Sequence, residues 1–139
     1  MIETLRFLYL LSALIYFSYL DVLYREVHNR PILWSYIGAL MFLINDINNG
    51  YSMFVFATTM LFYLIFFNLF YKLNGIGGAD IKIMWLIVML YPGILPLVIM
   101  LIAYLVALVP SMYFKAKKIN YGLPFVVFIT SGFLLYRVI

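Results

Sequence analysis

The sequence contains no cysteine and only one histidine, His28. Without cysteine the chain can form no disulfide, no thiolate zinc site and no cysteine nucleophile. A single histidine cannot make a histidine metal cluster, and it leaves no plausible serine–histidine–aspartate set. We therefore expect no metal and no cofactor, so that any chemistry has to come from other side chains.

Charged residues are also scarce. They make up 10% of the 139 residues, and hydrophobic residues make up 68%, whereas soluble domains contain about 25% charged residues. Too few polar residues remain to cover a globule in water, which predicts an all-α integral membrane protein. Since a transmembrane helix takes about 20 residues, the chain holds at most about six, as one transmembrane domain over residues 1–139. The net charge of +4 is interpreted as a topology signal, and no nucleic acid partner is expected.

Six apolar segments fit this number of helices. They cover roughly residues 2–20, 32–44, 51–73, 79–91, 94–114 and 121–138. The second and fourth are short, since about 13 residues of helix cover roughly 20 Å of a hydrocarbon layer of about 30 Å. Either these helices extend into their polar flanks, or the bilayer thins around them, or one of them is re-entrant. In the fifth segment Ala103, Ala107 and Ser111 recur every four residues, which predicts the close approach of another helix.

Lysine and arginine predict the orientation in the membrane. If the connections after the first, third and fifth segments share a side, that side holds most of the basic residues, and the other side holds only Arg6 and Arg137. The positive-inside rule then places the first group in the cytoplasm and both termini outside. The members of the cytoplasmic group are Arg25, Arg30, Lys72, Lys82, Lys115, Lys117 and Lys118.

The five acidic residues are few enough to weigh one by one. Glu3 is terminal, Asp46 lies in an asparagine-rich outer turn and Glu26 lies in a cytoplasmic loop, so solvation is the simplest expectation for all three. Asp21 directly follows an apolar run, and Asp80 directly precedes one. The predicted topology brings both of them to the cytoplasmic membrane boundary, where ionisable groups are costly and usually have a function or a partner.

Two interpretations of Asp21 and Asp80 are open from residue types alone. In the first, the two residues are boundary anchors in ion pairs, Asp21 with Arg25 and Asp80 with Lys82. In the second, they form a catalytic pair that shares one proton at neutral pH. The ionised carboxylate then takes a proton from water and the protonated one polarises a peptide carbonyl, which hydrolyses a peptide without a metal.

Three glycines precede Asp80 in the stretch Gly75-Ile76-Gly77-Gly78. Glycine lets an extended substrate backbone approach closely, and it permits unusual backbone dihedrals. The alternative is a flexible loop between two helices. A nucleotide-binding interpretation is weak, because no strand–turn–helix unit surrounds these glycines.

The stretch Gly77-Gly78-Ala79-Asp80-Ile81-Lys82 resembles the glycine–aspartate (GxGD) motif of type IV prepilin peptidases and archaeal preflagellin peptidases, which are membrane aspartic proteases. Residues 21–29 resemble the first motif of that family. This motif has an aspartate, an arginine four positions later, an aliphatic residue at six and an asparagine at eight, which are Asp21, Arg25, Val27 and Asn29 here. Gly122-Leu123-Pro124-Phe125 resembles the glycine/proline start of the family's last helix.

The resemblance implies a six-helix membrane protease with Asp21 and Asp80 as the catalytic pair. Supporting roles toward the motifs or the substrate would fall to Gly77, Gly78, Arg25, Asn29, Lys82 and Glu26, with Glu26 attracting a basic leader. The family removes a short basic class III signal peptide from prepilin-like and preflagellin-like precursors, just before their hydrophobic helix and at the cytoplasmic face of the plasma membrane. The expected partners are such precursors and the lipid bilayer, and the oligomeric state is left open.

Departures from the family pattern refine this expectation. Many members have proline where His28 stands and glycine where Ala79 stands, and the alanine form occurs in archaeal members. The four-cysteine cytoplasmic domain carried by many bacterial enzymes that also methylate the new N-terminus is absent, so we expect cleavage without N-methylation. The competing hypotheses are a non-enzymatic membrane subunit or small transporter, with Asp21 and Asp80 as boundary charges or an ion path, and an intramembrane protease. The latter group has a proline–alanine–leucine element that this sequence lacks.

Overall fold

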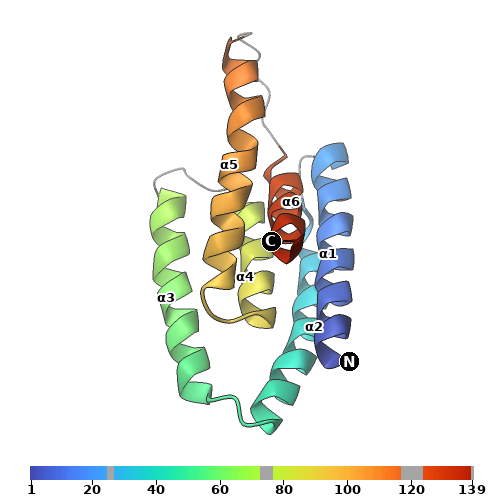
Figure 1. The fold of residues 1–139 in the computed structure, drawn as a ribbon, viewed down its shortest axis with the longest axis vertical. Helices are drawn as coiled ribbons and strands as arrows, with labels where there is room; N and C mark the ends of the chain where they lie inside the picture. The colour runs from blue at the N-terminus through green and yellow to red at the C-terminus, as the bar shows by residue number, and fades with distance from the viewer. Residues whose placement is uncertain (25–26, 73–76, 117–123, 139) are drawn as a thin grey trace.

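The computed structural model describes residues 1–24, 27–72, 77–116 and 124–138. Within these residues the chain is entirely helical (Figure 1). The helices are α1 (Ile2–Tyr24), α2 (Asn29–Asn48), α3 (Met53–Lys72), α4 (Gly78–Leu90), α5 (Leu95–Ala116) and α6 (Phe125–Val138). The all-helical prediction and the six predicted segments are therefore confirmed at the level of helices.

Successive helices run in alternating directions along the molecule (Figure 1). One end of the bundle, here called the Asp21 end, holds the last turns of α1, α3 and α5 and the first turns of α2, α4 and α6. The described basic residues Arg30, Lys72 and Lys115 belong to these turns, and Lys82 directly follows the first turn of α4. The opposite end, called the Arg6 end, holds Arg6 and Arg137. The charge asymmetry thus follows the two ends of the bundle, and its assignment to the two sides of a membrane stays a prediction.

Three of the helices are long and apolar enough to cross a membrane, namely Ile2–Tyr24, Met53–Lys72 and Leu95–Lys115. The short second segment has a simple explanation, because α2 extends into its polar flanks and reaches 20 residues. Its N-terminal extension includes Pro31, which is tolerated in a first helical turn. Its C-terminal end is followed by Gly50 with φ of 91°, a conformation that favours glycine after a helix. Six complete spans remain a prediction.

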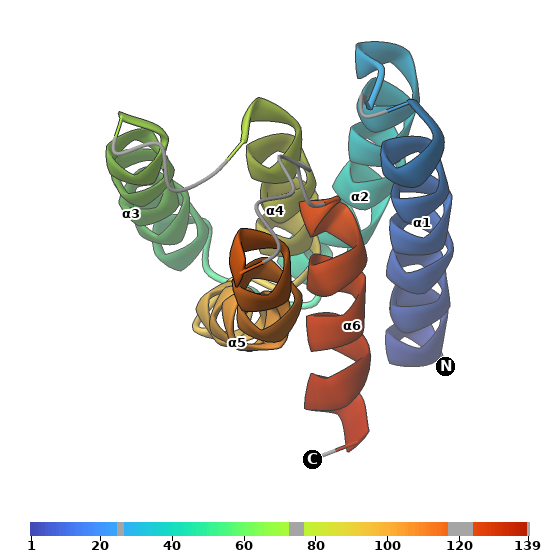
Figure 2. The same cartoon turned by 90° about the horizontal axis from the view of Figure 1, so that it is seen from above.

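The short helix α4 is the centre of the bundle. It has 13 residues and contacts each of the other five helices, as its place among them in Figure 2 indicates. Its buried residues cover more than half of its circumference, and Trp85 and Met89 on the remaining side are partly buried against the core. The buried residues are Ile83, Met84, Leu86, Ile87, Val88 and Leu90. A helix that is apolar all round is typical of one enclosed by protein. The first turn of α4, which carries Asp80, is therefore held by the whole bundle.

Helices α5 and α6 approach each other closely. Ala103 is fully buried, and a Cβ atom placed on Gly132 of α6 would lie 2.7 Å from the carbonyl oxygen of Ile99 in α5. Only glycine allows this contact between the two backbones. The predicted approach of another helix at Ala103 is confirmed and Ala107 is also buried, whereas Ser111 is exposed and lies outside the packed surface.

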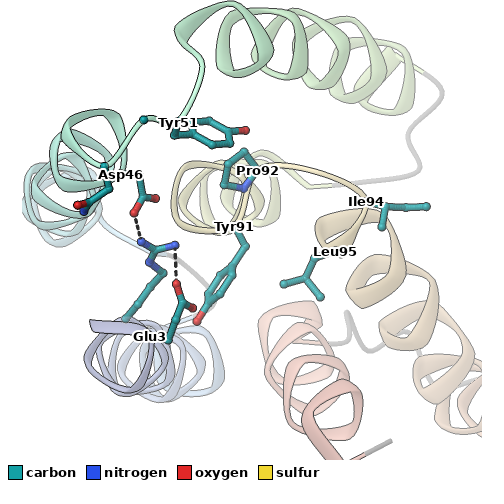
Figure 3. Close-up of a pocket in the computed structure, with 10 residues that line it drawn as sticks. Glu3, Asp46, Tyr51, Tyr91, Pro92, Ile94 and Leu95 are labelled. Carbon is teal, nitrogen blue, oxygen red and sulfur yellow. Dashed lines mark hydrogen bonds and ion pairs between the residues drawn. The ribbon is translucent and has the colours of Figure 1, made fainter. Parts of the chain in front are cut away.

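At the Arg6 end a buried arginine joins three helices. The Arg6 side chain is 7% exposed, and its guanidinium pairs with Glu3 at 3.2 Å and with Asp46 of α2. It also donates a hydrogen bond to the carbonyl oxygen of Leu90, the last residue of α4. Figure 3 shows Glu3 and Asp46 on either side of the guanidinium.

This cluster corrects one expectation from the sequence. Asp46 was expected to be solvated, but its side chain is only 22% exposed and is paired with Arg6. Glu3 is 70% exposed, as a terminal solvated carboxylate should be. The guanidinium of Arg6 also lies over the rings of Phe42 and Tyr91, an arrangement that stabilises a buried cation.

Candidate active site

A cavity of about 530 Å³ opens at the Asp21 end of the bundle. Its walls come from the end of α1, the start of α2, the start of α4 and the start of α6. The lining residues are Asp21, Val27, His28, Asn29, Gly77, Gly78, Ala79, Asp80, Lys82 and Phe125. The two motifs that were singled out in the sequence therefore meet around one space, and both aspartates face it.

Asp21 connects α1 to α6. It lies in the last turn of α1 and is 8% exposed. Its Oδ2 atom accepts a hydrogen bond from the backbone N–H of Val126, at 3.2 Å. Val126 is in the first turn of α6, where backbone N–H groups have no partner within the helix and the helix dipole favours a negative charge. The carboxylate thus caps a helix other than its own.

Asp80 caps its own helix. It is in the first turn of α4, which is not one of the three helices long enough to span a membrane. Its Oδ2 atom accepts a hydrogen bond from the backbone N–H of Gly77 at 3.2 Å. Burial, together with the negative charge of nearby Asp21, raises the pKa of Asp80 to about 6, although the Gly77 hydrogen bond acts in the opposite direction. The two carboxyl groups are close enough to influence each other's charge.

Gly77 and Gly78 have different surroundings. A Cβ atom on Gly77 would lie 2.8 Å from Oδ2 of Asp80, whereas a Cβ atom on Gly78 would meet nothing within 4 Å. Gly77 has φ of −75°, which any residue adopts. The expectation of unusual dihedrals is therefore wrong for Gly77. Glycine leaves room here for the carboxylate of Asp80, which would have to shift if a larger residue replaced it.

Asn29 and Lys82 join the two motifs. Nζ of Lys82 donates a hydrogen bond to Oδ1 of Asn29 at 2.6 Å, which links the start of α2 to α4. The hydroxyl of Tyr36 in α2 donates to the carbonyl oxygen of Lys82 at 2.5 Å. The alternative Asp80–Lys82 ion pair is wrong, because in the described part of the chain the ion pairs involve Arg6 and the Lys82 ammonium is bonded to Asn29.

A comparison with known families now identifies the chain. The model of the type IV leader peptidase family matches residues 8–112, which is more than half of the sequence. The chain belongs to the type IV leader peptidase family. No curated protein and no solved structure gives a significant match. The matched region includes Asp21, Asn29, Asp80 and Lys82, and together with the three long apolar helices it indicates a membrane protein of a peptidase family.

Helix α6 lies beyond the part of the chain that the leader peptidase family model matches. Phe125 of this helix lines the cavity, and the backbone N–H of Val126 donates its hydrogen bond to Asp21. The ring of Phe125 is 4.8 Å from that of Tyr104 in α5. Sequence reasoning named Phe125 only as part of a helix start. It missed Val126 altogether, because a backbone N–H has no signature in residue type.

Some of the predicted residues lie outside the described residues. These are Arg25, Glu26, Gly75, Lys117, Lys118 and the glycine and leucine of Gly122-Leu123. The Asp21–Arg25 pair and the attraction of a basic leader by Glu26 consequently stay predictions. Among the described residues, no three histidine, cysteine, aspartate or glutamate side chains gather in a way that could hold a metal ion.

Proposed function

We propose that this leader peptidase family member is a membrane aspartic endopeptidase, and that Asp21 and Asp80 are its catalytic pair. Its substrates would be prepilin-like or preflagellin-like precursors, whose basic leader is cut off at the cytoplasmic membrane face. One observation carries the proposal: two carboxyl groups from different helices line a single cavity of about 530 Å³. A raised pKa of one of them, partly caused by the other, is typical of carboxylates that share a proton.

The chemistry follows from such a shared proton. The ionised carboxylate accepts a proton from a water molecule, whose oxygen attacks the carbonyl carbon of the peptide bond. The protonated carboxyl group donates its hydrogen bond to the carbonyl oxygen and stabilises the charge that develops there. The carbon–nitrogen bond then breaks, and the leaving amine takes up a proton. Both water activation and carbonyl polarisation come from side chains of this chain.

The surroundings of the pair suit an extended peptide. The open space beside Gly78 leaves room for a substrate backbone near Asp80. The apolar part of a precursor would stay in the bilayer while its leader reaches the cavity from the cytoplasm. We propose that Glu26 attracts the basic leader, that the product is not N-methylated, and that the enzyme is archaeal.

The transporter alternative receives little support from the long helices. In α3 the polar side chains Thr58, Thr59 and Asn68 each donate a hydrogen bond to a carbonyl oxygen of their own helix. Polar groups satisfied in this way are typical of packing or lipid-facing helices. They do not form a polar path through the bundle.

The proposal is tested by cleavage of precursors with class III signal peptides, with the product N-terminus determined by mass. We expect a cut just before the apolar segment, without an added methyl group, and no product from Asp21→Asn or Asp80→Asn. Glu3→Gln, which changes an exposed acid at the opposite end, is the matched control and should cleave normally. Product from either aspartate variant would remove that residue from the pair, and a cut inside the apolar segment would favour an intramembrane protease.

The role of Glu26 is tested in the same assay. Glu26→Gln should weaken substrate affinity and reduce its dependence on salt, because the attraction of a basic leader is screened by ions. An affinity and salt dependence equal to those of the unchanged protein would remove Glu26 from the account. A protein that stays in the membrane and cuts no precursor would instead favour a non-enzymatic subunit.

A further inference from the structure

A partly buried polar contact joins α1 and α6 next to Asp21. The hydroxyl oxygens of Ser18 in α1 and Thr130 in α6 are 2.7 Å apart, and Thr130 is 8% exposed. Thr130 Oγ1 also lies 2.9 Å from the carbonyl oxygen of Val126 and 3.4 Å from that of Leu14. A hydroxyl has one proton to donate, and these carbonyls can only accept. Ser18 therefore donates to Thr130, and Thr130 donates to a carbonyl.

The Ser18–Thr130 contact and the Asp21–Val126 contact lie at neighbouring positions along α1 and α6. Ser18 precedes Asp21 by three residues on α1, and Thr130 follows Val126 by four residues on α6. Residues with these spacings share a face of a helix. The Asp21–Val126 and Ser18–Thr130 contacts thus join the same two faces at successive turns. Rotation or sliding of one helix against the other would lengthen at least one of these two contacts.

The neighbouring Ser131 shows that a hydroxyl in α6 can be satisfied by a hydrogen bond within its own helix. Its Oγ donates to the carbonyl oxygen of Val127, one turn earlier in the same helix, at 2.9 Å. Thr130 has the equivalent bond to Val126, and that bond alone would satisfy its proton. The contact with Ser18 is additional, and its effect is to connect two helices.

We propose that Ser18 and Thr130 are positioning residues, which hold the first turn of α6 in the place where the N–H of Val126 orients the carboxylate of Asp21. The consequence for catalysis rests on the proposed function. The consequence for the position of α6 does not, since it concerns hydrogen bonds between groups of the chain itself. A hydrolytic carboxylate must be held within a fraction of an ångström of its working geometry, and this pair of contacts provides the restraint.

The consequence for the position of α6 is tested by amide hydrogen exchange, measured by NMR on the full chain in detergent micelles. The N–H of Val126 is in a first helical turn and has no acceptor within α6, so its protection reports the bond to Asp21. We expect protection in the unchanged protein and its loss in Asp21→Ala. Ser18→Ala and Thr130→Val should each lower it at least about tenfold, whereas Thr130→Ser should keep it. Protection equal to that of the control Ser131→Ala in both Ser18→Ala and Thr130→Val would overturn the inference.

The consequence for catalysis is tested by the kinetics of cleavage of a precursor that the unchanged protein cuts. Ser18→Ala and Thr130→Val should each lower kcat about tenfold while KM stays within about twofold. The double variant should be no slower than either single one, because both remove the same contact. Thr130→Ser should retain the activity, as should the control Ser131→Ala. Unchanged kcat in both single variants would overturn the positioning role.

The exchange and cleavage experiments distinguish a failure of the proposed function from a failure of the positioning role. If the unchanged protein cuts no precursor, the proposed function fails, and the exchange experiment still decides whether Ser18 and Thr130 place α6. If Thr130→Val does not fold, Ser18→Ala removes the same contact from the other helix and carries both measurements.

Discussion

Replacement of Gly77 by alanine adds a single methyl group beside the carboxylate of Asp80. The new Cβ atom would lie 2.8 Å from Oδ2 of Asp80, whereas ordinary contacts of this kind begin near 3.4 Å. The carboxylate must therefore move by roughly half an ångström, since repulsion rises steeply below van der Waals contact. This movement also weakens the 3.2 Å hydrogen bond from the N–H of Gly77. The backbone itself need not change, because φ of Gly77 is −75°.

Gly77→Ala should affect the cleavage rate more clearly than it affects folding. A displacement of about 1 Å can cost about 100-fold in rate, so we expect kcat of Gly77→Ala to fall about tenfold. Loss of one helix-capping hydrogen bond costs about 1–2 kcal/mol, which a protein with about 5–15 kcal/mol of stability survives. The variant should therefore remain folded and cleave slowly. The assay is precursor cleavage at saturating substrate, with thermal unfolding in micelles measured in parallel.

Gly78→Ala is the matched comparison. Its Cβ atom would meet nothing within 4 Å, and alanine is the better residue in a helix. If a substrate backbone passes over Gly78, alanine there raises KM, but kcat stays close to that of the unchanged protein. A Gly77→Ala variant with full kcat, or equal losses of kcat in the two variants, would refute the reasoning about the carboxylate of Asp80.

Three further outcomes are expected from other parts of the molecule. Arg6→Gln should lower the free energy of unfolding by about 1–3 kcal/mol in denaturant titrations, because it leaves Asp46, whose side chain is 22% exposed, without its partner; adding Asp46→Asn should restore part of the loss, and simple addition of the two losses would contradict the pairing. If the protonated form of Asp80 polarises the carbonyl, the cleavage rate falls as pH rises through its pKa of about 6; this fall should persist in His28→Gln, which removes the histidine that lines the cavity, and its disappearance there would contradict the assignment to Asp80. Gly132→Ala should cost about 1–3 kcal/mol, because its Cβ would lie 2.7 Å from a backbone carbonyl oxygen of α5; an unchanged melting temperature would contradict this packing.

The helices could be predicted from the sequence because long apolar runs alternate with glycine, proline and asparagine. The residue at which α2 begins could not be predicted in this way. Asn29, Arg30 and Pro31 look like a loop, but a first helical turn accepts all three, since its N–H groups need no partner within the helix. Polar residues at a helix end are therefore hard to tell from the loop beside it.

The candidate site was predictable to a similar extent. Asp21, Asp80, Asn29 and Lys82 were chosen from their motifs, and the structure places all four on one cavity. The partners of these side chains were not predictable, because the Val126 N–H and the Asn29–Lys82 bond depend on how helices far apart in the sequence come together. The same reason explains the error at Asp46, whose partner Arg6 comes from a different helix.

The side chains at positions 21 and 80 line one cavity, and the absence of cysteine from the chain allows a direct measurement of their proximity. In the variant Asp21→Cys/Asp80→Cys the two new thiols are the only ones present, so a short bifunctional thiol reagent applied to membranes reports their proximity. We expect an intramolecular cross-link in this variant and none in Asp46→Cys/Asp80→Cys, whose thiols lie at opposite ends of the bundle. Failure of the first pair to cross-link, although each thiol reacts singly, would contradict the placement of both side chains on one cavity.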